Sequence, residues 1–375
     1  MNKITVIGGG AAGLMAAIAA AKNGAQVSLI EPNERLGKKI NITGKGRCNV
    51  TNDTDLEGLM AHIPRNGRFL YSALSHFTSR DTMAFFEGCG VPLKVERGDR
   101  VFPVSDSAFD ITDALKRQVK TLGVRWLHDR AASVETADGR VTAVTGEKGT
   151  YPADAVIVAT GGMSYPGTGS TGDGYRIAAA LGHTIVEPRG SLVPLVSDDD
   201  CCRHMQGLSL KNVELTVYNG KNKPVFREFG EMLFTHFGVS GPLVLSASAH
   251  LRDWGKEQYR LSIDLKPALD QQKLEARILR DISESPNRDV EKLLCGLVPH
   301  SMAPVMTRRL GFPPTLKANS LTKEQRRGLV ELLKHFAILV TGVRPVAEAI
   351  VTAGGVKVSE VKPNTCLLYT SPSPR

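Results

Sequence analysis

The sequence has few cysteines and no long hydrophobic run, and these absences exclude several protein classes. Its 375 residues contain no apolar stretch near the ~20 residues of a membrane-spanning helix, so none is expected. None of the six cysteines forms a C-x-x-C pair, so neither a zinc ribbon nor a redox-active disulfide is indicated, and no metal site is predicted. The chain starts with Met-Asn-Lys and no signal-peptide core, so we expect a cytoplasmic protein with reduced thiols.

Long runs of one charge are also missing. The formal net charge is +9, but the basic residues are scattered, and pairs such as Lys38–Lys39 and Arg326–Arg327 are the densest groups. No basic segment is interleaved with aromatic side chains, so a solvated basic surface is the favoured explanation. An anionic substrate or a nucleic acid is the alternative, and no motif supports the nucleic acid, which we do not expect as a partner. We expect a small-molecule substrate and no membrane partner; the sequence does not indicate an oligomeric state.

The first thirty-one residues carry the strongest functional pattern. Residues 3–7 are a β-branched run typical of a buried parallel strand. The three glycine places of the following G-x-G-x-x-G motif are filled by Gly8, Gly10 and Gly13. These glycines allow a sharp turn, leave room for a pyrophosphate and let the next helix pack on the strand. A second strand, 26–30, ends at Glu31, which can accept hydrogen bonds from both ribose hydroxyls.

This pattern predicts a dinucleotide bound with its phosphates at a helix N-terminus. The carboxylate of Glu31 would repel the 2′-phosphate of NADP. Because the motif begins at residue 8, FAD is favoured, since such flavoproteins usually begin with the strand that holds the ADP half.

A glycine- and lysine-rich loop follows between residues 37 and 52. Its three glycines, three lysines and Arg47 suit a backbone nest that binds an anion, and we expect it to wrap the cofactor's pyrophosphate. Cys48 in this loop is either a redox thiol near a flavin or, as is more common, a small buried residue.

A second glycine-rich loop follows the predicted strand 155–162. In the flavin version of the doubly wound fold, this strand rejoins the sheet and its Thr160–Gly162 turn passes the cofactor. The density of glycines and hydroxyls over 163–175 indicates a binding loop before a helix at 176–181. Asp173 either takes part in binding or simply caps that helix.

Four separated segments together resemble one known family. They are 37–52, 159–175, 230–242 and the segment that begins at 351. They are similar to motifs of the BaiN-like NAD(P)/FAD-dependent oxidoreductases, flavoproteins that include enzymes described as aminoacetone oxidases and steroid ene-reductases. The resemblance covers residues 1 to about 365. It implies a two-dinucleotide-binding FAD fold with an inserted domain, and NAD(P)H as the electron donor.

The motifs and the resemblance together predict the residues that contact FAD. They are Gly8, Gly10, Ala11, Ala12, Gly13, Glu31, Lys38, Gly46, Arg47, Cys48, Asn49, Ala131, Thr160, Gly161 and Gly162.

The residues themselves agree with an insertion. Residues 187–194 look like a crossing linker, and alternation at 213–217 and 261–265 predicts antiparallel strands. Helical spacing appears at 268–282, 290–297 and 322–336. We therefore predict an α/β, doubly wound Rossmann-type fold with an inserted β-rich and helical domain. The predicted parts are an FAD-binding domain at 1–190, a substrate or cap domain at 191–345, and an incomplete return to the first domain at 346–365.

The last ten residues depart from the family pattern. Residues 366–375 have no helical or strand period and contain two Ser-Pro pairs, so we expect a non-native tail in place of the family's last flavin-binding segment. A genuine disordered tail is the alternative. If the tail is non-native, we expect the chain to hold FAD weakly and to be inactive.

The sequence is interpreted as an FAD-dependent oxidoreductase. The resemblance implies hydride transfer from NAD(P)H through flavin N5 to a conjugated C=C bond of a hydrophobic or carboxylated substrate. His236 and Tyr165 are candidates for a proton donor or carbonyl-polarising group, although a lone histidine is more often structural. The alternatives are a flavin amine oxidase that uses dioxygen, and an RNA-associated or non-catalytic flavoprotein.

Overall fold

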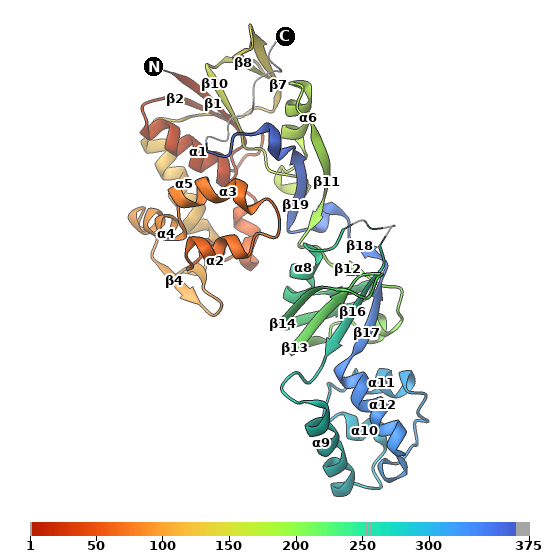
Figure 1. The fold of residues 1–375 in the computed structure, drawn as a ribbon. Coiled ribbons are helices and arrows are strands. Elements are labelled where there is room, and N and C mark those ends of the chain that lie inside the picture. Colours follow the sequence, from red (N-terminus) through yellow and green to blue (C-terminus); the bar gives the residue numbers. More distant parts are fainter. Residues whose placement is uncertain (1, 253, 255–256, 365–375) are drawn as a thin grey trace. The chain divides into compact units, whose positions relative to one another are not determined.

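The computed structural model describes residues 2–252, 254 and 257–364. They form two compact units: the first runs to Arg189 and resumes at Thr352, and the second is Gly190–Val351 (Figure 1). The expected non-native tail lies outside the described residues. Within the described ranges, no helix has both the length and the apolar character needed to cross a bilayer.

A four-stranded parallel sheet forms the centre of the first unit. Its strand order is β10–β1–β2–β6, with bounds β10 Ala155–Val158, β1 Lys3–Ile7, β2 Gln26–Ile30 and β6 Arg125–Leu127. Val6 on β1 is fully buried, as expected for a central strand covered on both faces. This arrangement confirms the predicted doubly wound α/β fold.

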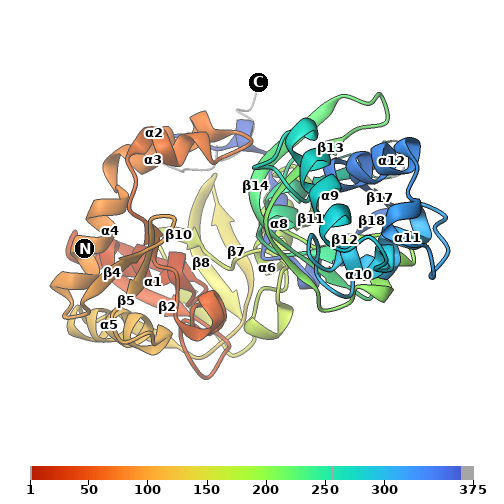
Figure 2. The same ribbon diagram turned by 90° about the horizontal axis from the view of Figure 1, so that it is seen from below.

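Both faces of this sheet are covered. The helices α1 Ala11–Lys22 and α5 Ala108–Thr121 contact each other, and α1 packs on β1 and β2 (Figure 2). Residues of a separate small core, including Ile7 and Ile30, join the sheet to a three-stranded meander and to α6. These elements are β7 Ala131–Ala137, β8 Arg140–Gly146, β9 Thr150–Pro152 and α6 Asp173–Ala180. Asp138 and Gly139, which connect β7 to β8, both have positive φ angles, as expected for the hairpin turn that Asp-Gly favours.

Most of the remaining elements of the first unit lie between β2 and α5 in sequence. They are the 3-10 turn η1 Ile40–Gly46, α2 Leu56–Ala61, α3 Gly67–His76, α4 Ser79–Gly88, and the small sheet of β3 Thr51–Asn52, β5 Arg100–Pro103 and β4 Leu93–Glu96. The turn η2 Pro166–Thr168 lies in the second glycine-rich loop.

The second unit is built on a seven-stranded antiparallel sheet. In spatial order its strands are β17 Phe336–Val340, β16 Tyr259–Asp264, β13 Ser209–Tyr218, β14 Pro224–Thr235, β15 Gly238–Ser240, β12 Leu195–Val196 and β18 Gly342–Val343. Two short helices, α7 Cys201–His204 and α8 Pro242–Ser248, contact β14. Figure 1 shows the remaining helices grouped at one end of the unit: α9 Gln271–Glu284, α10 Val290–Leu294, α11 Ala303–Arg309 and α12 Lys323–Lys334.

The chain segments at the boundary are strands rather than the expected linker. β11 Ile185–Ser191 pairs with β19 Val351–Val356 in a two-stranded sheet. The chain crosses between the units after Arg189, inside the predicted segment 187–194, but it does so within a strand rather than an irregular linker. Pro188 argued against a strand in the sequence, because proline has no N–H to donate to a neighbouring strand. An edge strand tolerates it. Single turns η3 Ala318–Ser320, η4 Val346–Glu348 and η5 Val358–Glu360 complete the described structure.

Candidate functional site

The first glycine loop has the geometry of a phosphate cradle. Gly8 has φ +107°, and a Cβ atom there would lie 2.5 Å from the carbonyl oxygen of Ala159; one at Gly13 would collide with the carbonyl of Gly8. A Cβ at Gly10 would meet nothing within 4 Å. Gly10 is also the N-cap of α1, and no side chain caps this helix end. The first N–H groups of α1 therefore border open space of the kind that a pyrophosphate requires, which fits the predicted cofactor.

Glu31 is held rigidly at the end of β2. Its side chain is buried; Oε2 accepts a hydrogen bond from the N–H of Gly9 at 2.6 Å, and Oε1 accepts from the N–H and Nδ2 of Asn33 at 2.8 and 2.7 Å. A carboxylate has about four acceptor directions, so it retains capacity for a ribose hydroxyl. The structure thus adds a second role for Glu31, which fixes the glycine turn.

Asn33 is a site residue that sequence reasoning missed. Besides contacting Glu31, its Nδ2 donates to the carbonyl oxygen of Thr168 at 3.2 Å. The side chain therefore links the end of β2 to the second glycine-rich loop, 135 residues away in sequence. In the sequence, its position two residues after Glu31 was the one indication of this role, and it is not specific.

The 37–52 loop follows a backbone path rich in left-handed residues. Gly44, Lys45, Gly46 and Cys48 all have φ between 54° and 84°. The N–H of Cys48 donates to the carbonyl oxygen of Thr43 at 3.1 Å and closes the loop. The Cys48 side chain is buried, and burial raises the pKa of its thiol. These facts favour the interpretation of Cys48 as a small buried residue rather than a reactive thiolate.

Arg47 is engaged by carboxylates of the small sheet and its neighbouring loop. Its guanidinium donates to both oxygens of Glu96 at 3.0 and 2.8 Å, lies 3.2 Å from Asp106 and covers the ring of Phe102. The hydrogen bond to Glu96 raises the pKa of Arg47. Its predicted contact with FAD, like that of the exposed Lys38, stays a prediction.

Asn49 and Ala131 lie on different parts of this unit. With its amide nitrogen turned toward them, Asn49 lies 3.1 and 3.2 Å from the carbonyl oxygens of Thr51 and Val101. Ala131 is buried at the start of β7 and pairs with Gly146 of β8. Their cofactor contacts also stay predictions.

The Thr160–Gly162 turn is tied to the returning strand β19. Strand β10 ends at Val158, and the N–H of Ala159 still donates to the carbonyl oxygen of Ile7 at 2.8 Å. Thr160 Oγ1 accepts from the N–H of Gly174 at 3.1 Å. Gly162 leaves no room for a Cβ atom, because Thr352 of β19 lies against it. The predicted turn thus lies beside the first glycine loop and is fixed by residues from three distant segments.

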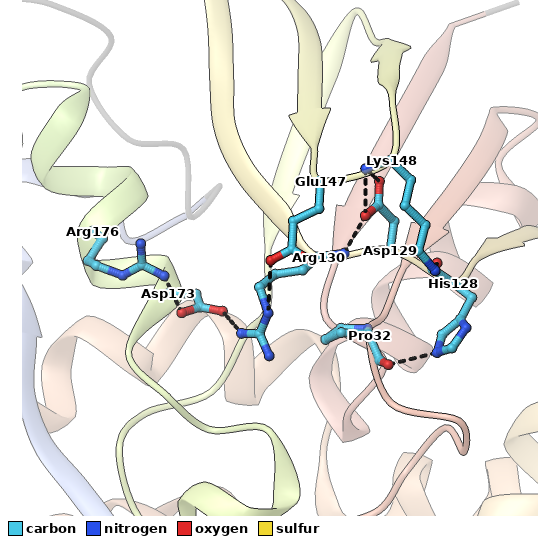
Figure 3. A network of polar contacts seen from close by, with 8 residues as sticks. All are labelled: Pro32, His128, Asp129, Arg130, Glu147, Lys148, Asp173 and Arg176. Atoms are coloured by element: carbon cyan, nitrogen blue, oxygen red, sulfur yellow. Dashed lines mark hydrogen bonds and ion pairs between the residues drawn. The ribbon is translucent and has the colours of Figure 1, made fainter.

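A polar network lies at the start of β7 (Figure 3). Asp129 is buried, and it accepts hydrogen bonds from the N–H of Arg130 at 2.7 Å, from the N–H of Lys148 at 3.2 Å and from the Tyr151 hydroxyl at 2.7 Å. Burial acts to raise the pKa of Asp129, but these hydrogen bonds outweigh it and lower the pKa. Asp129 therefore fixes the meander against the end of β6.

Asp173 belongs to the same network and does not cap its helix. Figure 3 shows it between Arg130 and Arg176, and its Oδ2 accepts from Arg130 at 2.7 Å. The N-cap of α6 is Gly172, which has no side chain to cap with. The capping interpretation of Asp173 is therefore wrong, because the helix begins one residue earlier than that role requires.

The two candidate proton donors lie in different units. Tyr165 lies in the first unit, three residues after Gly162, with its side chain 42% exposed. His236 lies in the second unit between β14 and β15, where its exposed ring stands edge-on to Phe237 at a centroid separation of 5.0 Å. The catalytic role of each residue stays a prediction.

Comparison with known proteins covers both units. A family model described as "HI0933-like protein Rossmann domain" matches residues 2–372. A 3-dehydro-bile acid delta(4,6)-reductase from Clostridium scindens is 30% identical over 372 residues, which cover 97% of this chain and 89% of that protein. A ribosomal RNA dihydrouridine synthase from Haemophilus influenzae is 31% identical over 367 residues, covering 96% and 87%, and one from Escherichia coli is 30% identical over 361 residues, covering 96% and 86%.

Proposed function

The chain belongs to the HI0933-like Rossmann family, and we propose that it is an FAD-dependent reductase of a C=C bond conjugated to a carbonyl, with NAD(P)H as electron donor. Membership makes it a flavoprotein oxidoreductase, as the resemblance implied. The observation that carries the cofactor proposal is the open space at Gly10, bordered by the uncapped start of α1.

The roles of the binding residues follow from their positions. The first N–H groups of α1 would hold the pyrophosphate, and Glu31 would accept a hydrogen bond from the ribose. The Thr160–Gly162 turn, with φ +75° at Gly161, would let the backbone approach the flavin end closely. When bound, FAD supplies the redox chemistry, accepting two electrons from a nicotinamide and passing them to the acceptor.

Proton delivery falls to this chain's own side chains. Reduction of a conjugated C=C bond needs one proton at the carbon next to the carbonyl, and a tyrosine hydroxyl near the flavin turn can donate it. The two candidates for this role are His236, in the second unit, and Tyr165, which follows Gly162 closely.

The relatives' names suggest the substrate class. A delta(4,6)-reductase and a dihydrouridine synthase share one type of chemistry, which is saturation of a ring double bond conjugated to a carbonyl. A cyclic enone is therefore the first candidate substrate. A uracil ring in RNA is the second, and the net charge of +9 favours it, although the sequence has no compact basic motif.

An anaerobic titration of FAD-reconstituted protein tests this proposal. We expect NADH or NADPH to bleach the oxidised-flavin absorbance and a cyclic enone to restore it without oxygen. Dihydrouridine formed in an RNA transcript would identify the second substrate. Hydrogen peroxide released from an amine in air, with no bleaching by NAD(P)H, would show an amine oxidase instead and contradict the proposal.

A further inference from the structure

Tyr165 is held in a backbone conformation that an aromatic residue rarely adopts. Its φ and ψ angles are 51° and 61°, in the left-handed region. Bulky side chains are disfavoured there by contacts between Cβ and the backbone. Such strain persists only where surrounding structure imposes it, and it is commonly found at functional sites. Because the residue is 42% exposed, packing of its own side chain is incomplete and does not account for the strain.

Three side chains from distant segments fix the residues on both flanks of Tyr165. Lys39 Nζ donates to the carbonyl oxygen and the hydroxyl of Ser164 at 2.8 and 3.2 Å. Thr352 Oγ1 accepts from the N–H of Ser164 at 3.1 Å. On the other flank, Asn33 donates to the carbonyl of Thr168. The backbone around Tyr165 is thus fixed by residues 126, 187 and 132 positions away in sequence, on segments that also border the predicted cofactor site.

Lys39 is an unusual choice for such a contact. Its side chain is half-buried, and burial lowers the pKa of its amine. Placing a lysine there costs hydration, and its amine donates to the carbonyl oxygen and the hydroxyl of Ser164, which are neutral acceptors. This cost is understandable if the position of the next residue matters for the reaction.

We propose that Tyr165 determines substrate specificity as the ring on which a planar conjugated acceptor stacks, and that Lys39, Asn33 and Thr352 are positioning residues. The inference rests on the proposed function. Because a hydroxyl lies in the plane of its ring, a stacking Tyr165 leaves proton donation to the other candidate, His236. An enone is flat and stacks well on an aromatic face, whereas its saturated product is puckered and stacks poorly. The ring would therefore select the substrate and favour release of the product.

The first experiment replaces Tyr165 in FAD-loaded protein and measures whether the aromatic ring, rather than the strained backbone, binds the acceptor. The probes are testosterone, which carries a planar 4-en-3-one, and 5α-dihydrotestosterone, its saturated counterpart, with binding followed by the change in flavin absorbance. We expect Tyr165→Ala and Tyr165→Gly to weaken testosterone by about 3- to 10-fold and the saturated ketone much less. Tyr165→Phe should bind testosterone as the wild type does. Tyr71→Ala removes another exposed tyrosine of the same unit and should change neither ligand.

The melting temperatures test the strain independently of any ligand. At a left-handed position glycine is more stable than alanine, so Tyr165→Gly should melt above Tyr165→Ala. Lys39→Met should weaken testosterone while leaving the ring in place, and Lys39→Arg should restore part of the affinity.

The outcomes separate this inference from the proposed function. Unchanged testosterone binding in Tyr165→Ala overturns the stacking role alone, as does equal weakening of both steroids. Wild-type affinity in Lys39→Met overturns the positioning role. A wild-type protein that binds neither steroid and is not bleached by NAD(P)H contradicts the proposed function and this inference together, whereas the order of the two melting temperatures still reports the strain.

Discussion

Gly10 and Gly13 were predicted together from one motif, but the structure gives them different reasons. A side chain at Gly13 would collide with the carbonyl of Gly8, so this glycine is required by the fold itself. A side chain at Gly10 would project into open space, and its N-cap φ of −80° is accessible to any residue. The fold would admit a side chain at Gly10, so we attribute its glycine to the proposed pyrophosphate, and the two positions can be separated by mutation.

We expect Gly10→Val to abolish FAD retention, weakening binding more than about 100-fold, because the valine would occupy the space of the pyrophosphate. The melting temperature of FAD-free protein should change by no more than a few degrees. Gly13→Val, the matched control, should lower that melting temperature sharply. Fluorescence titration with FAD and a thermal melt measure both effects. Normal FAD binding by Gly10→Val would place the cofactor elsewhere.

Glu31 tests which half of the cofactor is recognised. Glu31→Gln keeps one side-chain oxygen and the shape, but it loses a charge-assisted ribose contact worth about 1.5–3 kcal/mol. We therefore expect FAD to bind about 10- to 150-fold more weakly, while FMN, which lacks the ADP half, binds the variant and the wild type equally poorly. The same fluorescence titration serves. Equal affinity of the wild type for FAD and FMN would refute this role.

At the scale of elements, Asp129 and its hydrogen bonds join β6 to the meander. The carboxylate has a lowered pKa in the folded protein, so the folded state binds its proton less readily than the unfolded state. Its stabilising effect is then fully present above the unfolded value of about 3.9 and is lost as the pH falls below it.

We expect Asp129→Asn to melt about 3–8 °C below the wild type at pH 7, because bonds to a charged acceptor are replaced by weaker ones. The difference should shrink as the pH falls below about 4, because the carboxylate then takes up a proton in the unfolded chain and, at still lower pH, in the folded protein. Asp138→Asn, in the exposed hairpin turn of the same meander, is the control and should follow the wild type. A difference that stays constant from pH 7 to pH 3 would argue against ionised Asp129.

Most elements of the first unit could be predicted because their signals are local. Strands 3–7 and 26–30 follow from residue type and spacing alone, and the structure confirms them. The contacts of Asn33, Lys39 and Thr352 could not be predicted, because each joins residues more than 120 positions apart. The left-handed backbone conformation of Cys48 and Tyr165 could not be predicted either, since neither residue type prefers it.

At the scale of the whole molecule, each hydrophobic core belongs to one unit. The largest core, with Phe234 and Phe336 fully buried, lies entirely within Gly190–Val351, whereas the two cores around the parallel sheet lie outside that range. The second unit is also one continuous chain segment. It therefore has what independent folding requires.

We expect residues 190–351, produced alone, to unfold in one cooperative transition with an enthalpy of about 110 kcal/mol near 60 °C. Differential scanning calorimetry measures this. A shorter fragment, 190–258, retains β12–β15 but lacks β16 and β17, and it should show no such transition. Loss of cooperativity in the longer fragment would mean that the second unit depends on the rest of the chain.

Because β11 pairs with β19, the two-stranded sheet can form only late in the synthesis of the chain. The ribosome makes β11 just as the second unit begins, and β19 emerges only about 160 residues later. At 5–20 residues per second, this interval is roughly 8–30 s. Thr352, which fixes the turn after Gly162, arrives in the same late segment. A nascent chain therefore has its first glycine loop and parallel sheet long before it has a complete binding site, and the second unit is synthesised during that wait.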